Sequence, residues 1–179
     1  MHRVIAVSVI LVLAGCAAQP GTPVTLPAGS APAPGIVDEA VTVGQDIAAF
    51  YRRPQAGQPA AAARAIAEIE WLAATLPMSP RWSTIGGSGM TQLQLARNEA
   101  RAALGIPPGA PAQSVINGLA AASTALAAND SAGVARALPR ATFPLGPEET
   151  VRRLSAPPQN RSIMAALASL SAARRGGGG

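Results

Sequence analysis

Residues 59–76, PAAAARAIAEIEWLAATL, show the helical pattern from which the fold of this chain is predicted. Apolar side chains recur in this stretch every three or four residues, which is the spacing of one face of an α-helix. Proline is favourable at the first helical position and stops a helix after the last turn, so Pro59 and Pro77 mark the two ends. We therefore predict a helix over residues 59–76, with an apolar face made of Ala62, Ile66, Ile69, Ala73 and Leu76.

A second helical pattern precedes this one, over about residues 36–53. Asp38 and Glu39 lie in its first turn, where the helix dipole favours negative charge, and Pro54 follows its last turn. Only about five residues separate the two predicted helices, so we expect them to pack antiparallel. The apolar face of this helix comprises Ile36, Ala40, Val43, Ile47 and Phe50.

Five further helices are predicted downstream, over about residues 90–104, 112–128, 130–138, 147–154 and 159–175. Gly105 is expected to end the first of these and Asp130 to cap the third. Aromatic residues make up only 3% of the chain, which favours close-packed helices over a sheet. We expect an all-α fold, a single antiparallel bundle of five to seven helices over residues 37–175, followed by a disordered glycine tail at residues 176–179.

The segment before the bundle has the composition of a linker. Residues 17–36 contain five prolines and three glycines and show neither helical nor alternating periodicity. We expect residues 16–36 to be a disordered Pro/Gly/Ala tether, which would reach ~60 Å as polyproline II or ~25 Å as a flexible coil.

The first sixteen residues have the order of a secretory signal. Met1, His2 and Arg3 form a short basic start, and an apolar run of ten residues follows at 4–13. A membrane-spanning helix needs roughly 20 apolar residues, so this run is too short to be one. The stretch from Leu13 to Cys16, Leu-Ala-Gly-Cys, resembles the lipobox of bacterial lipoproteins.

The resemblance implies that residues 1–15 are a signal peptide and that Cys16 becomes the acylated N-terminus. The three acyl chains found in that family would make attachment effectively permanent, because one chain alone holds a protein only marginally. Ala17, where an aspartate would favour the inner membrane, favours an outer-membrane address facing the periplasm. The alternative is an ordinary cleaved signal with an incidental cysteine.

The mature chain lacks most side chains that perform catalysis. His2 is the only histidine, Cys16 the only cysteine, and no lysine occurs. These absences exclude Ser-His-Asp and Cys-His pairs, Schiff-base chemistry and zinc sites with nitrogen or sulfur ligands, so we expect no metal and no cofactor. Loss of Arg3 leaves thirteen arginines against nine acids, and this net charge of +4 is too small to indicate nucleic-acid binding.

A carboxylate pair could still support a cell-wall hydrolase. Glu68 and Glu70 are two residues apart on one helix and point in different directions, and Glu68 is expected to be a surface partner of Arg64. Glu148 and Glu149 lie in the first turn of a helix, which indicates a structural role. None of these acids is predicted to be catalytic.

Two other patterns can be interpreted either as structural or as functional. The run at residues 86–89, GGSG, precedes a helix and could hold an anion, or it could be a flexible turn. The arginine pairs at residues 52–53, 152–153 and 174–175 lie near helix ends, where they could complement the helix dipole or contact lipid head groups.

Residues 77–89 form the longest irregular stretch within the domain, and such loops are often functional. We predict partner binding by Arg81, Trp82 and Ile85. Trp82 is either an exposed anchor for a partner or a lid over the end of the bundle.

These observations favour a membrane-anchored periplasmic or envelope lipoprotein that acts as a non-enzymatic helical interaction module. Its expected partners are the membrane, through the lipid anchor, and an envelope protein or cell-wall component, with no nucleic acid. A carboxylate-dependent hydrolase and a carrier of an apolar ligand are the alternatives.

Overall fold

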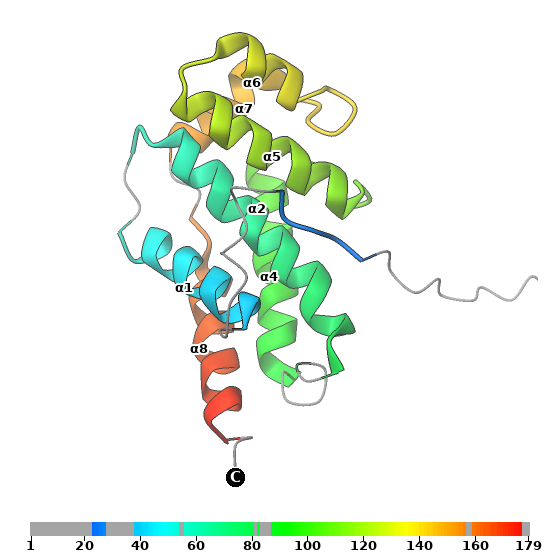
Figure 1. The fold of residues 1–179 in the computed structure, drawn as a ribbon, viewed down its shortest axis with the longest axis vertical. Coiled ribbons are helices and arrows are strands. Elements are labelled where there is room, and N and C mark those ends of the chain that lie inside the picture. The colour runs from blue at the N-terminus through cyan, green and yellow to red at the C-terminus, as the bar shows by residue number, and fades with distance from the viewer. Residues whose placement is uncertain are drawn as a thin grey trace, which may run out of the picture.

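The computed structural model describes residues 23–27, 38–53, 56–80, 82, 87–156 and 159–176. Within those ranges the chain forms seven α-helices and no strand, so the predicted all-α bundle is confirmed (Figure 1). None of the described helices is both long and apolar enough to cross a membrane. The helices are α1 (Glu39–Arg52), α2 (Pro59–Thr75), α4 (Gly87–Leu104), α5 (Ala112–Ala127), α6 (Ser131–Ala137), α7 (Gly146–Ser155) and α8 (Arg161–Gly176), and a 3-10 turn at Leu76–Met78 follows α2.

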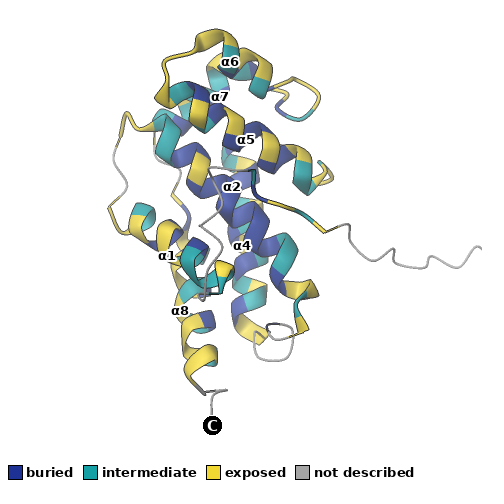
Figure 2. Cartoon of the chain, in the orientation of Figure 1, coloured by how far each residue is buried: buried dark blue, intermediate teal, exposed yellow. Residues whose placement is uncertain are grey.

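Helix α2 lies at the centre of the bundle. It contacts α1, α4, α5 and α7, and Figure 2 shows that almost its whole length is buried. The predicted apolar face is buried, and so are residues on other sides of the helix, among them Ala63, Ala65 and Ala67. The predicted one-sided apolar face is therefore only part of the buried surface of this helix.

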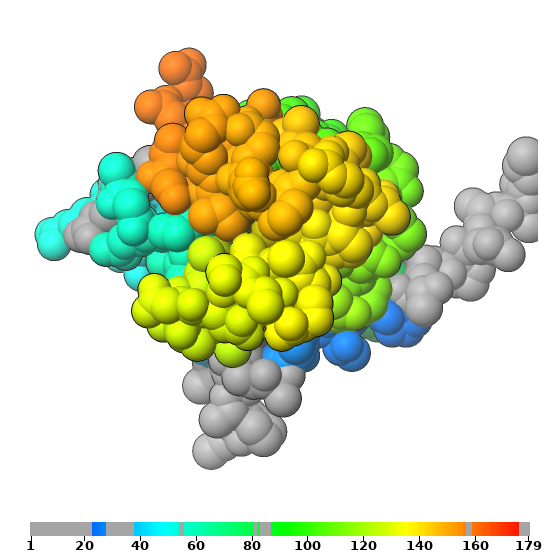
Figure 3. All heavy atoms as spheres, turned by 90° about the horizontal axis from the view of Figure 1, so that it is seen from above, coloured from blue at the N-terminus to red at the C-terminus, as the bar shows by residue number. Residues whose placement is uncertain are grey.

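The core consists of two clusters that meet along α2. One cluster joins α1, α4 and α8 to the C-terminal half of α2, with Ile47, Leu72 and Ile163 among its members. The other joins α5, α6 and α7 to the N-terminal half of α2 and includes Phe143 and Leu154. Figure 3, which looks onto the end of the molecule, shows the yellow and orange atoms of α6 and α7 together on this end.

The predicted cap at Asp130 is confirmed, since its carboxylate accepts a hydrogen bond from the Gly133 amide at the start of α6. Helix α1 begins at Glu39 rather than near residue 36, and Asp38 precedes its first turn as the N-cap, where its carboxylate accepts a hydrogen bond from the Ala40 amide. Gly105 follows α4 with a φ of +66°, a conformation that favours glycine.

Helix α4 begins at Gly87 rather than near Met90, so the prediction that residues 86–89 precede a helix is wrong for Gly87, Ser88 and Gly89. Gly89 is buried, and a Cβ at this position would lie 2.9 Å from the Leu170 Cγ. The glycine therefore allows α4 and α8 to approach closely. Gly176 is likewise the last residue of α8 rather than part of a disordered tail.

Residues 23–27, here called the strap, lie against the bundle. Leu26 is only 9% exposed and belongs to the first core cluster, and Val24 packs against the same cluster. The Thr25 amide donates to the Gln113 side-chain oxygen at 2.8 Å, and the Gln113 amide nitrogen donates to the Thr25 carbonyl at 3.0 Å. The prediction of a disordered tether is therefore wrong for these five residues; Cys16 and the remaining predicted tether and tail lie outside the described ranges.

Candidate functional site

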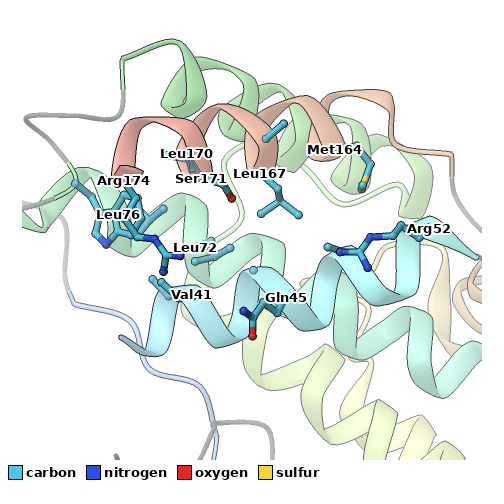
Figure 4. Close-up of a pocket in the computed structure, with 15 residues that line it drawn as sticks. Val41, Gln45, Arg52, Leu72, Leu76, Met164, Leu167, Leu170, Ser171 and Arg174 are labelled. Carbon is cyan, nitrogen blue, oxygen red and sulfur yellow. The ribbon is translucent and has the colours of Figure 1, made fainter. Parts of the chain in front are cut away.

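A cleft of about 270 Å³ runs between α1 and α8, with α2 behind it (Figure 4). We call it the α1–α8 cleft. Its floor is apolar and is formed by Leu72, Leu76, Leu170 and Trp82. The walls are Ala40, Val41, Gly44, Gln45, Ala48 and Arg52 of α1 and Met164, Leu167, Ala168, Ser171 and Arg174 of α8.

Small side chains on α1 make the cleft possible. Ala40, Gly44 and Ala48 are spaced four residues apart, so they lie one above another on one face of the helix. They fill little space beside α8, whose Leu167 projects toward α1 (Figure 4). A Cβ added to Gly44 would lie 3.4 Å from the Leu167 Cδ2, so Leu167 lies directly opposite the bare backbone of Gly44.

Arg52 and Arg174 stand at opposite ends of the cleft. Helices α1 and α8 run antiparallel, so Arg52 in the last turn of α1 lies beside Met164, and Arg174 in the last turn of α8 lies near Val41 (Figure 4). Neither guanidinium has an ion pair or hydrogen bond with any residue that the structure describes. No carboxylate lines the cleft among the residues that the structure describes. The result is an apolar channel with an unpaired cation at each end.

The structure corrects the interpretation of Trp82. Its side chain is only 5% exposed and packs in the first core cluster, so it is not an exposed anchor. The alternative prediction, that it covers the end of the bundle, agrees with this burial. Trp82 also contributes to the floor of the cleft. Arg81 and Ile85, the other two predicted partner-binding residues, lie outside the described ranges.

Glu68 pairs with Arg64 as predicted, but it is not at the surface. The Arg64 Nε donates to the Glu68 Oε1 at 2.8 Å, while Glu68 is only 1% exposed. Burial raises the pKa of the Glu68 carboxyl to about 7, against the lowering effect of Arg64. The surface position was predicted from a one-sided helix, and α2 is enclosed on several sides.

Glu70 is held by two arginines of α4. The Arg97 Nε donates to its Oε1 at 2.7 Å, and Arg101 binds both of its oxygens. Arg101 also donates to the carbonyls of Pro107 and Pro108, so it ties the loop after α4 to α2. Both carboxylates of α2 are therefore committed to ion pairs inside the bundle.

Glu148 and Glu149, the second carboxylate pair, also lie in different surroundings. Glu149 pairs with Arg152 and Arg153, and these hydrogen bonds lower the pKa of its carboxyl to about 2. Glu148 lines a different depression of about 410 Å³ between α5, α6 and α7, together with Asp130.

Asp130 is already engaged in capping α6. One of its oxygens accepts from the Gly133 amide at 2.8 Å, and the other lies 3.5 Å from the Arg136 Nη2. This bonding gives Asp130 a structural role at the rim of that depression.

Among the described residues, no group of three histidine, cysteine, aspartate or glutamate side chains could hold a metal ion. No family model, curated protein or solved structure matches this chain. The candidate site therefore rests on the geometry of the α1–α8 cleft alone. Sequence reasoning missed this cleft; the small residues at positions 40, 44 and 48 were the available signal.

Proposed function

We propose that this protein is a lipid-anchored lipoprotein of the cell envelope whose helical domain is a non-enzymatic binding module. The α1–α8 cleft is its binding site. The observation that carries the proposal is an apolar floor between Arg52 and Arg174. Among the described residues, neither arginine has an ion-pair partner and no carboxylate lines the cleft.

The lining residues favour binding over catalysis. Ser171 is the only hydroxyl among them, and a serine nucleophile needs an adjacent base to activate it. The described lining residues include no imidazole, carboxylate or amine that could serve as this base.

The two arginines of the cleft favour an anionic ligand. A guanidinium is always protonated and forms its strongest hydrogen bonds with carboxylates and phosphates. The apolar floor between the two arginines contacts a hydrocarbon surface favourably, because water is released from both. The cleft therefore suits a ligand that is apolar along its length and anionic at an end.

The strap supports a position close to the membrane. Residue 23 lies seven positions after Cys16. A fully extended chain spans ~3.3–3.6 Å per residue, so the anchor and the strap are at most about 25 Å apart. A protein acylated at Cys16 would hold the bundle near the lipid head groups. This is less than half the ~60 Å reach expected if all of residues 17–36 were a free polyproline II linker.

Anchoring is tested by replacing the cysteine. The Cys16→Ser variant should leave the membrane fraction or remain as the unprocessed precursor, while the wild type fractionates with the outer membrane. A variant that still sediments with membranes at mature size would contradict lipid attachment at Cys16.

Binding in the cleft is tested by obstructing it from α8. Ala168 is exposed and lines the cleft, whereas Ala165 is exposed on the same helix and does not. The Ala168→Phe variant should lose a molecule that co-purifies with the wild type and with Ala165→Phe, as measured by native mass spectrometry. Equal adducts on all three proteins would place the binding site elsewhere.

A further inference from the structure

The shape of the α1–α8 cleft narrows the class of ligand further. The lining residues of α1 extend from Ala40 to Arg52, which is about 18 Å at 1.5 Å of rise per residue. The cleft volume over this length is only about 270 Å³. The cleft is therefore long and thin.

A helix does not fit within such a channel. An α-helix with its side chains is about 10–12 Å wide, so a stretch as long as the cleft occupies on the order of 1,400 Å³ or more. A partner helix could insert only individual side chains into the cleft. Its backbone would not lie between the two arginines. A hydrocarbon chain has the required thinness.

We propose that the α1–α8 cleft binds a single acyl chain with an anionic head group. The chain lies along Leu72 and Leu76, and the head group pairs with Arg52 or Arg174 at one end. This inference rests on the proposed function, because it names the ligand of the same site.

Two estimates bracket the length of the chain. A zigzag of carbon atoms joined by bonds of ~1.5 Å needs about fourteen carbons to span the cleft. At about 30 Å³ for each water-sized group, the cleft volume of about 270 Å³ holds about nine groups. Affinity should therefore rise with chain length up to about nine to fourteen carbons and then stop rising.

The two arginines should discriminate between charged and neutral ligands. Both are exposed at the cleft ends and lack partners among the described residues, so a carboxylate can reach either without displacing an existing ion pair. Removing both charges should abolish this discrimination, and removing one at a time identifies which end holds the head group.

The proposal is tested by isothermal titration calorimetry on the full mature chain, residues 16–179, produced without its signal and therefore without lipid. The probes are saturated fatty acids from octanoate to hexadecanoate and the matching uncharged alcohols. Each added methylene should tighten binding about three- to fourfold until the cleft is full. Tetradecanoate should bind about two- to fivefold more tightly than tetradecanol, because an ion pair with an exposed guanidinium is lost with the alcohol.

Variants locate the binding. Ala168→Phe should remove tetradecanoate binding and Ala165→Phe should retain it. The double variant Arg52→Gln/Arg174→Gln should bind the acid and the alcohol equally, while Arg136→Gln, an exposed arginine of α6, should behave as the wild type.

Each failure has a distinct meaning. Equal binding of tetradecanoate and tetradecanol to the wild type would overturn the anionic head group. No saturable fatty-acid binding, together with a co-purifying adduct that Ala168→Phe removes, would overturn the acyl chain and leave the cleft as a binding site for another class, such as a peptide. Absence of both would overturn the proposed function as well.

Discussion

Arg101 and Glu70 form an ion pair that is buried on both sides of the contact, with side chains 3% and 2% exposed. The guanidinium binds the two carboxylate oxygens through two nitrogens, and Arg97 contributes a further contact from the same helix. This network joins the central helix α2 to α4. Because α4 in turn packs on α8, the pair also supports one wall of the cleft.

Glu70→Ala should destabilise the protein by about 3–5 kcal/mol, since it leaves the Arg101 charge buried without its partner. Urea unfolding followed by circular dichroism measures this loss. As a control, Arg152→Ala removes one partner of an exposed pair and should change the unfolding midpoint little. Equal effects of the two substitutions would contradict a buried role for Glu70.

The strap should contribute to folding stability. Leu26→Ala in the mature chain should lower the free energy of unfolding by about 2–3 kcal/mol, because it removes a buried side chain from the first core cluster. Leu95→Ala, at a position 46% exposed, provides a matched control and should cost far less. If Leu26→Ala unfolds at the same urea concentration as the wild type, residues 23–27 do not hold the bundle in solution.

Trp82 should behave as a core residue. Trp82→Ala is expected to destabilise the protein by about 3–5 kcal/mol, since the indole is only 5% exposed. A thermal melt by circular dichroism gives the result directly. A small change in melting temperature would revive the interpretation of Trp82 as a surface anchor.

Glu68 should make stability depend on pH. Its carboxyl titrates at about pH 7 in the folded protein, above the ordinary value of 4.5, so the folded state binds more protons between these values. The free energy of unfolding should therefore fall as the pH rises from about 4.5 to 7 and level off above. The groups that influence this carboxyl are Arg64 and Asp46.

Glu68→Gln should remove this dependence. The gain in stability of the variant over the wild type should grow between pH 4.5 and pH 8, by on the order of 2 kcal/mol. Urea unfolding of both proteins at several pH values measures the gap. A gap that stays constant across this range would mean that Glu68 is already ionised throughout.

The helix boundaries were largely predictable because proline, glycine and capping aspartates mark them in the sequence. Pro59 opens α2, and Asp130 caps α6. The start of α4 was not predictable in this way, since glycine is unfavourable in helices. Gly89 is nevertheless helical because its missing Cβ gives space to Leu170, a contact between segments far apart in the sequence.

Several buried features were not predictable, because they arise from tertiary packing. Glu68 and Glu70 are buried only because α2 is surrounded by four helices, and the sequence shows its strongest stripe on one face. Leu26 has no periodic neighbours, so nothing local indicates that it reaches the core. The cleft itself depends on how α1 and α8 pair across more than a hundred intervening residues.

The most direct test of acyl-chain binding is nuclear magnetic resonance of isotope-labelled methionine methyl groups during a titration with tetradecanoate. Met164 lines the cleft and is 37% exposed, while Met78 is 46% exposed and lies outside it, so one sample contains both the reporter and its control. We predict that the Met164 signal shifts saturably and the Met78 signal stays in place. An unchanged Met164 signal, or a shift confined to Met78, would contradict binding in the α1–α8 cleft.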